Sequence, residues 1–176
     1  HEILALQRVV VQEIVPLYRR LLDRGQIELT TTPFFHPILP LVIDTEINRR
    51  ARPDLPLPSR FRAPEDADTQ LRRAVDFHRT TFGHPPAGLW PSEGSVCPEL
   101  LPLVHHAGLR WLATDEGVLA RSFELSGRPW YRHADLYQPY RAGESGQDVT
   151  IVFRNRDLSD AFGFVYHKTG PDSPAR

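Results

Sequence analysis

The sequence has too little of several features to fall into the disulfide-rich, membrane-spanning or strongly charged classes of protein. Its 176 residues include one cysteine, Cys97, which excludes an internal disulfide framework and suits a reducing compartment, here expected to be the cytoplasm. No uninterrupted apolar run approaches the ~20 residues that a membrane-spanning helix needs. The formal net charge is −1, with both signs dispersed, so we expect a soluble globular chain with no nucleic-acid or membrane partner.

Common catalytic motifs are absent as well. The chain has no P-loop and no dinucleotide-binding glycine pattern, and PSEGS (91–95) does not form the G-x-S-x-G turn of a nucleophilic serine. His105 and His106 are adjacent, so they point to different faces of a helix, and neither HxxxH nor HExxH occurs. We therefore expect no metal site and no cofactor. Cys97 is interpreted as a small buried residue rather than a nucleophile.

The apolar residues that are present recur with helical and strand periods. Spacings of three and four predict a first helix that is kinked at Pro16 and ends at Gly25; they involve Ile3, Leu6, Val10, Ile14, Leu17 and Leu21. Further helices are predicted over about 68–82, after a cap at Ser95, and over 115–123. Strands are predicted for QIELTTT (26–32), PPAGLW (85–90), LRWLAT (109–114) and DVTIVFRN (148–155). The proline-studded segment 33–42, residues 44–64 and residues 126–148 are predicted to be loops.

This alternation of strands and helices favours an α/β fold with a parallel sheet and crossover helices. Polar residues able to do chemistry follow each strand, namely Thr32 and His36, then Glu93, then Asp115 and Glu116, then Asp157 and Asp160. In an α/β barrel or an open parallel sheet, the carboxyl ends of the strands gather on one face, where active sites lie. The pattern therefore indicates an enzyme.

Glu93 with Asp157 or Asp160 is a candidate pair of carboxylates from two strand ends. Glycoside cleavage needs such a pair, because one group attacks the anomeric carbon while the other protonates the leaving oxygen. Two plainer interpretations stay open. Glu93 can interact with the N-terminus of the following helix, and the RNRDLSD segment (154–160) can be an arginine–aspartate ion-pair network.

Aromatic side chains near these strand ends are candidates for stacking on sugar rings. Trp90 lies three residues before Glu93, and Trp130 lies in the long predicted loop with the neighbouring Tyr131. Trp111 lies inside a predicted strand and is interpreted as a core residue. His36 sits between two prolines, which would hold it rigidly for a hydrogen bond to a sugar hydroxyl or for a structural role. Further aromatic candidates are Tyr137 and Tyr140, and Asp115 and Glu116 are candidate substrate-binding carboxylates.

Three blocks of the sequence resemble glycoside hydrolase family 57, the α-glucan-active retaining enzymes. They are GQIELTTTPFFHPILPLV (25–42), GLWPSEGSV with WLATDEGVL (88–96 and 111–119), and VFRNRDLSDAFGFVY (152–166). The resemblance implies a seven-stranded (β/α) barrel, a double-displacement mechanism, and an α-glucan or maltooligosaccharide substrate. It places Glu93 at the family's nucleophile and His36 and Trp90 close to the sugar site.

The resemblance leaves the acid/base open. The family's acid/base is an aspartate after a later strand, in many members within a D-G-E-like block that this chain lacks. The acid is therefore Asp157, Asp160 or a residue beyond the end of the chain. The family's opening His-Gln-Pro strand is also absent, so residues 1–176 resemble one internal part of a catalytic domain, and alone they are expected to hydrolyse poorly.

Two other functions remain as alternatives to an active glucan hydrolase or transglycosylase. The first is a catalytically inactive carbohydrate-binding homologue or fragment. The second is a metal-dependent deacetylase on a similar barrel, against which the histidine spacings argue. Hydrolysis, transfer and branching are not separated by these motifs, and neither is the oligomeric state.

Overall fold

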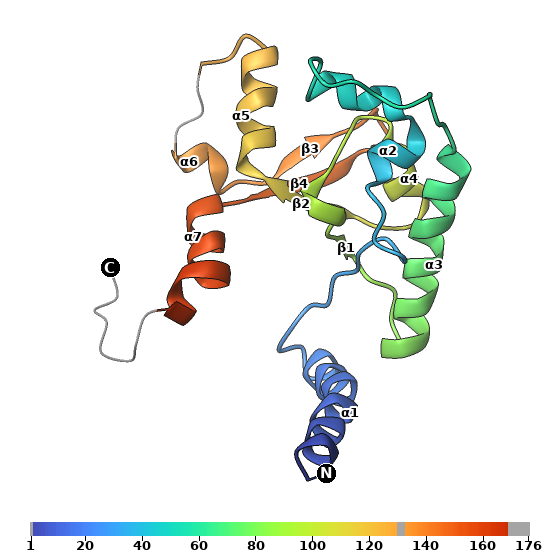
Figure 1. Cartoon of the computed structure of the whole chain (residues 1–176), viewed down its shortest axis with the longest axis vertical. Coiled ribbons are helices and arrows are strands. Elements are labelled where there is room, and N and C mark those ends of the chain that lie inside the picture. The colour runs from blue at the N-terminus through green and yellow to red at the C-terminus, as the bar shows by residue number, and fades with distance from the viewer. Residues whose placement is uncertain (1, 130–132, 169–176) are drawn as a thin grey trace.

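The structure, a computed structural model, describes residues 2–129 and 133–168 and has a mostly parallel four-stranded sheet at its centre (Figure 1). The sheet order is β1-β2-β4-β3, with β1 Gly88–Leu89, β2 Trp111–Asp115, β4 Val149–Arg154 and β3 Tyr140–Ala142. β1, β2 and β4 run parallel, whereas β3 pairs antiparallel with β4. The expectation of an α/β chain with a parallel sheet is confirmed.

The strand predicted over 26–32 was wrong, because this segment makes only an isolated bridge between Thr31 and Leu89. Thr31 N–H donates to the Gly88 carbonyl at 3.0 Å, and Trp90 N–H donates to the Thr31 carbonyl at 2.8 Å. β1 is only two residues long, and prolines at 86 and 91 flank it. Proline lacks the N–H that a longer ladder needs on this side, and the segment 26–32 meets β1 at the single bridge from Thr31 to Leu89.

The four longer helices are α1 Glu2–Asp23, α3 Pro64–Phe82, α4 Leu100–His106 and α5 Glu116–Leu125. α3 begins earlier than predicted, with proline in its first turn, and ends as predicted at Gly83, whose φ is 84°. The cap predicted at Ser95 was wrong. Ser95 is extended, and the segment 97–99 forms a turn in which Leu100 N–H donates to the Cys97 carbonyl at 3.1 Å, so α4 starts five residues after Ser95 without a side-chain cap.

Short helical elements occupy segments that were predicted to be loops. α2 Leu39–Ile43 lies in the proline-studded segment, with a proline in its first turn, and η1 Thr45–Arg50 follows it directly. Residues 126–148 contain α6 His133–Leu136 and the edge strand β3. After β4 come α7 Arg156–Asp160, a π-helical turn Ala161–Val165 and a 3₁₀ turn Tyr166–Lys168.

Two clusters of buried side chains hold these elements together. The larger one joins α2, α3 and α4 to β1, β2 and β4, and it includes Leu39, Leu71, Leu89, Leu100, Val104, Leu112 and Val149. The smaller one joins α5 and α6 to the sheet through Leu119, Phe123 and Leu136, with Tyr140 and Phe153 packed against them. Figure 1 shows these two groups of helices on opposite sides of the sheet.

Helix α1 stands apart from the rest of the chain (Figure 1). It forms over Glu2–Asp23 and ends two residues before the predicted Gly25, yet none of its described residues is buried, and Ile3, Val10 and Ile14 are 42–74% exposed. Among residues 2–129 and 133–168, no helix is long and apolar enough to cross a membrane.

Candidate functional site

Glu93 is presented by a tight turn at the carboxyl end of β1. The turn is the 3₁₀ element η2, Ser92–Gly94, in which Glu93 has φ 56° and ψ 21°. This left-handed conformation is costly for a residue with a side chain, by about 1–3 kcal/mol, and persists only where surrounding contacts impose it. Ser92 and Gly94 are buried, whereas the Glu93 side chain is 76% exposed. The carboxylate therefore points out of a buried turn.

The neighbouring strand fastens this turn. The Thr114 hydroxyl, fully buried on β2, donates to the Gly94 carbonyl at 2.5 Å. A Cβ atom on Gly94 would lie 3.6 Å from the Thr114 hydroxyl oxygen and 3.8 Å from the Trp90 ring, in ordinary contact. η2 is thus packed between the end of β2 and Trp90, which leaves little freedom to relax the backbone of Glu93.

His36 faces Glu93 from a different loop. Its Nε2 lies 3.6 Å from Oε1 of Glu93, a pair that is ionic when the imidazole is protonated. His36 has φ 57°, and its N–H donates to the Pro33 carbonyl at 2.9 Å. Within the described residues, His36 and Glu93 are the two non-glycine residues with positive φ. Two strained residues from separate loops therefore meet, a pattern typical of functional sites.

Asp115, at the end of β2, accepts hydrogen bonds from two arginines and from the helix that follows. Arg154 Nε donates to it at 2.9 Å, Gly117 N–H donates at 2.8 Å, and Arg156 donates through Nη2. Partial burial by itself raises the pKa of Asp115. The hydrogen bonds from Arg156, Gly117 and Arg154 outweigh that effect and lower the pKa from 3.8 to about 2. Asp115 is therefore ionised at neutral pH.

The RNRDLSD segment forms the arginine–aspartate network that was one of its two interpretations. Arg154 Nη1 lies 3.5 Å from Asp160 and donates to Ser159 Oγ at 3.1 Å. Asp157 is exposed in the first turn of α7. Glu116 accepts a 3.3 Å hydrogen bond from Arg156 N–H, which ties α5 to α7. The parallel order of β1, β2 and β4 puts these acids and Glu93 at the same edge of the sheet.

A cavity of about 400 Å³ lies beside Glu93, with Asp115 also in its wall. Much of the lining is apolar, and it comes from separate parts of the chain: Ile38 and Leu41 at α2, Ile47 and Ala51 at η1, Val96 after η2, and Val118 on α5. Polar lining comes from Asn48, Arg50 and Ser95. Sequence reasoning missed Asn48 and the other η1 residues, because the segment 44–64 carries no periodic pattern and reaches the site only through the fold.

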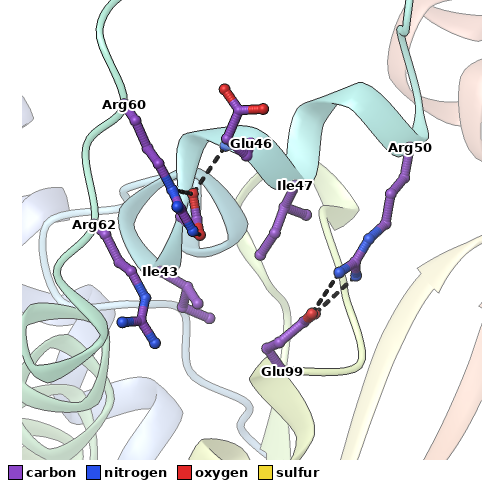
Figure 2. Close-up of a pocket in the computed structure, with 8 residues that line it drawn as sticks. Ile43, Glu46, Ile47, Arg50, Arg60, Arg62 and Glu99 are labelled. Atoms are coloured by element: carbon purple, nitrogen blue, oxygen red, sulfur yellow. Dashed lines mark hydrogen bonds and ion pairs between the residues drawn. The ribbon is translucent and has the colours of Figure 1, made fainter.

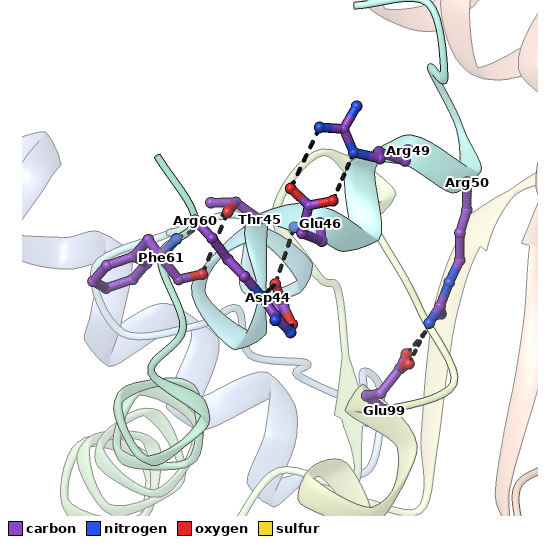
Figure 3. A network of polar contacts seen from close by, with 8 residues as sticks. All are labelled: Asp44, Thr45, Glu46, Arg49, Arg50, Arg60, Phe61 and Glu99. Carbon is purple, nitrogen blue, oxygen red and sulfur yellow. Dashed lines mark hydrogen bonds and ion pairs between the residues drawn. The ribbon is translucent and has the colours of Figure 1, made fainter. Parts of the chain in front are cut away.

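Ion pairs and hydrogen bonds hold η1 in the wall of this cavity (Figure 3). Asp44 accepts from Glu46 N–H at 3.0 Å, which caps η1, and also binds the Arg60 guanidinium. The hydrogen bond from Arg60 is the main cause that lowers the pKa of Asp44 to about 2. Arg50 makes a two-point ion pair with Glu99 at 2.6 and 2.9 Å. η1 is thus fixed at both of its ends.

A second, more polar cavity of about 340 Å³ lies beside η1, and Figure 2 shows its charged lining. Arg50, Arg60, Arg62, Glu46 and Glu99 contribute to it. Arg50 and Glu99 bind one another across it. Ile47 and Arg50 line both cavities, so these two η1 residues lie between them.

The aromatic candidates are dispersed. Trp90 is partly buried beside η2, next to Glu93. Trp111 packs its ring against Gly88 and donates through Nε1 to Glu28 at 3.0 Å, so it is a partly buried structural residue. Tyr140 packs against Phe123 and Phe153 at the smaller buried cluster, which indicates a structural role rather than stacking on a sugar. Trp130 and Tyr131 lie outside the described residues, and Tyr137 is exposed and accepts from Asn155 at 3.0 Å.

No group of three or more metal-binding side chains occurs within residues 2–129 and 133–168. Cys97 is buried, as expected, and burial raises the pKa of its thiol to about 12. A thiol with that pKa stays protonated at neutral pH, which does not suit a nucleophile.

Comparison with known proteins gives a consistent result. The model of glycosyl hydrolase family 57 matches residues 4–176. Alpha-amylase 1 of Dictyoglomus thermophilum is 24% identical over 129 residues, which are 73% of this chain and 15% of that protein. The 4-alpha-glucanotransferase of Thermococcus litoralis is 23% identical over 139 residues, 79% of this chain and 17% of that protein. The chain thus spans about a sixth of these relatives.

Solved structures agree on the fold. The crystal structure of the Thermococcus litoralis 4-alpha-glucanotransferase superposes with a TM-score of 0.61 at 23% identity, covering 85% of this chain and 19% of that one. A branching enzyme from Pyrococcus horikoshii gives a TM-score of 0.58 at 17% identity, covering 87% of this chain and 26% of that one.

Proposed function

The chain belongs to glycosyl hydrolase family 57, and from this membership and the setting of Glu93 we propose that the full-length protein is a retaining α-glucan hydrolase or transglycosylase. The observation that carries the proposal is an exposed carboxylate on a strained turn at a strand end, beside a cavity of about 400 Å³. We also propose that residues 1–176 are one part of a seven-stranded (β/α) barrel, of which β1, β2 and β4 are neighbouring parallel strands.

In this proposal Glu93 is the nucleophile. Its carboxylate attacks the anomeric carbon of an α-linked glucose, and the glycosidic bond breaks as a glycosyl ester forms and the acid/base protonates the leaving oxygen. Water or a sugar hydroxyl then loses its proton to the acid/base, attacks the same carbon and releases Glu93. His36, 3.6 Å from the carboxylate, is proposed to donate a hydrogen bond to Glu93 or to a substrate hydroxyl. The mostly apolar cavity wall and Trp90 are proposed to pack against the C–H faces of an α-glucan or maltooligosaccharide.

The acid/base must be a carboxyl group that can hold a proton at neutral pH. Asp115 does not suit this role, because its pKa is about 2 and two arginines occupy its oxygens. We therefore propose that Asp115 and Glu116 do not bind the substrate directly. They orient Arg154 and Arg156 at the edge of the site instead. The acid/base proposal therefore stays with Asp157, Asp160 or an aspartate outside residues 1–176. A retaining mechanism requires it to lie about 5–5.5 Å from Glu93 in the working enzyme.

Mechanism-based labelling of the full-length protein tests the nucleophile. An activated, fluorinated glucosyl fluoride accumulates as a covalent ester because its second step is slow, and peptide mass spectrometry locates the modified residue. We expect the label on Glu93 and none on the Glu93→Gln variant. Glu124→Gln is the control, because Glu124 is an exposed carboxylate on α5 that pairs with Arg121 and does not line the Glu93 cavity, so it should leave labelling intact. A label on any other carboxylate contradicts the assignment.

A second candidate, an inactive carbohydrate-binding homologue, is favoured by one observation. Of the two carboxylates that line the Glu93 cavity, Asp115 is fully engaged by arginines. Binding of maltooligosaccharides without turnover, unchanged by Glu93→Gln, would support this second function. Loss of a measurable turnover in Glu93→Gln would exclude it.

A further inference from the structure

Helix α3 holds the loop that carries His36. Phe35 N–H donates to the side-chain oxygen Oε1 of Gln70 at 2.8 Å, and Phe34 N–H donates to the backbone carbonyl of Gln70 at 3.3 Å. One residue of α3 therefore accepts from the two backbone amides that directly precede His36.

Side-chain packing strengthens this attachment. The Arg73 guanidinium, one turn further along α3, stacks over the Phe34 ring at 4.4 Å and over the Phe35 ring at 5.1 Å. Phe77 meets Phe34 edge to face, with ring centroids 5.7 Å apart. Phe35 nevertheless remains 68% exposed, so packing restrains its side chain on one side only. The hydrogen bond from its amide to the Gln70 side chain restrains its backbone directly.

We propose that Gln70 is a positioning residue, which holds His36 in its left-handed conformation and so keeps the imidazole beside Glu93. Adopting that conformation is disfavoured about five- to hundredfold for a residue with a side chain. A single hydrogen bond typically changes such a local equilibrium by about two- to tenfold. The two effects are of similar size, so loss of the Gln70 acceptor is enough to let residue 36 populate other conformations. The catalytic consequence rests on the proposed function, whereas the positioning itself does not.

Nuclear magnetic resonance of the His36 ring in the 176-residue chain tests the positioning. With Gln70 intact, the Glu93→Gln substitution should shift the Cε1 and ring nitrogen signals of His36, because the imidazole lies 3.6 Å from that carboxylate. In a Gln70→Met background, the change in these His36 signals caused by Glu93→Gln should be smaller by a factor of about two or more. Gln70→Glu keeps an acceptor oxygen and should restore the full shift. Gln70→Asn, whose acceptor is too short to reach, should behave like Gln70→Met.

Arg72→Met is the matched control, because Arg72 is an exposed residue of the same helix whose ion pair is with Asp68. It should leave the shift unchanged. The proposal is overturned by a full shift in Gln70→Met and Gln70→Asn, by failure of Gln70→Glu to restore it, by an equal loss in Arg72→Met, or by no shift with Gln70 intact. In the full-length protein, Gln70→Met should also lower kcat/KM on a maltooligosaccharide by about ten- to hundredfold, with rescue by Gln70→Glu. If no turnover exists while the ring shifts follow the expected pattern, the proposed function fails and the positioning stands.

Discussion

The ion pairs at Asp115 should make the stability of the chain depend on pH in a specific way. The perturbation is Asp115→Asn, which removes the charge but leaves a side-chain oxygen able to accept the Gly117 N–H that caps α5. The variant therefore isolates the contribution of Arg154 and Arg156, which both bind this carboxylate.

The size of the effect follows from the pKa. The fall from 3.8 to about 2 in the folded state corresponds to at most about 2.5 kcal/mol, at about 1.36 kcal/mol per pKa unit. The Asp115 side chain is 20% exposed and that of Arg156 is 51% exposed. Because solvent screens such a pair, we expect Asp115→Asn to lower the free energy of unfolding at pH 7 by about 1–2 kcal/mol.

The sign with pH follows because the pKa of Asp115 is lower in the folded state than in the unfolded chain. The stabilisation is complete above the unfolded pKa of about 4, and it is lost as the pH falls through the folded pKa of about 2. About half of it should remain at pH 3.

Urea unfolding of the native chain and of Asp115→Asn, followed by tryptophan fluorescence at pH 7 and pH 3, measures the effect. The difference in free energy of unfolding should be about half as large at pH 3 as at pH 7, and smaller again in 1 M salt. Asp23→Asn, at an exposed position on α1, should change stability by no more than about 0.5 kcal/mol. An equal cost at both pH values, or a cost at pH 7 no larger than that of Asp23→Asn, would refute the reasoning.

Two further predictions concern the turn and the strand that present Glu93. Gly88→Ala should lower the free energy of unfolding by about 1–3 kcal/mol, because its Cβ would lie 2.3 Å from the Trp111 ring. In the same urea assay Gly88→Ala should cost less in a Trp111→Ala background than in the native chain, and an unchanged midpoint for Gly88→Ala would contradict the close packing. Glu93→Gly should be more stable than Glu93→Ala by about 1 kcal/mol, since glycine adopts the φ of 56° freely; the usual order, with alanine the more stable, would show that residue 93 is not left-handed.

The parts of the fold that could be predicted are those set by local patterns. The strands predicted over 109–114 and 148–155 correspond to β2 and β4, and the helix predicted over about 68–82 corresponds to α3. The strand predicted over 26–32 failed because its composition favours a strand, whereas pairing depends on a partner. That partner, β1, has two residues between Pro86 and Pro91, and the segment meets it at one bridge, from Thr31 to Leu89.

Other elements depend on contacts that are distant in the sequence. η1 forms where Asp44 both caps it and binds Arg60, sixteen residues away in the chain. Nothing in the local pattern of 44–64 indicates that arrangement, so Asn48 could not be placed beside Glu93 in advance. The site could be predicted to the level of which strand ends carry acids. The sequence alone could not show that Asp115 binds arginines whereas Glu93 is exposed. The two arginines that bind Asp115 come from the end of β4 and from α7, and only the fold brings them to it.

The chemistry proposed for Glu93 depends on backbone strain that two loops share. A glutamate that needed only exposure could sit in a relaxed turn, whereas Glu93 is held left-handed by a buried turn that Thr114 fastens to β2. His36 is held left-handed by a loop attached to α3, and the two side chains meet at 3.6 Å. Each strained residue costs stability that a relaxed surface turn would keep. Because the contacts that impose the two conformations come from β2 and from α3, the cost follows from the rest of the fold rather than from the loops themselves. This is the reason to treat Glu93 and His36 as one site.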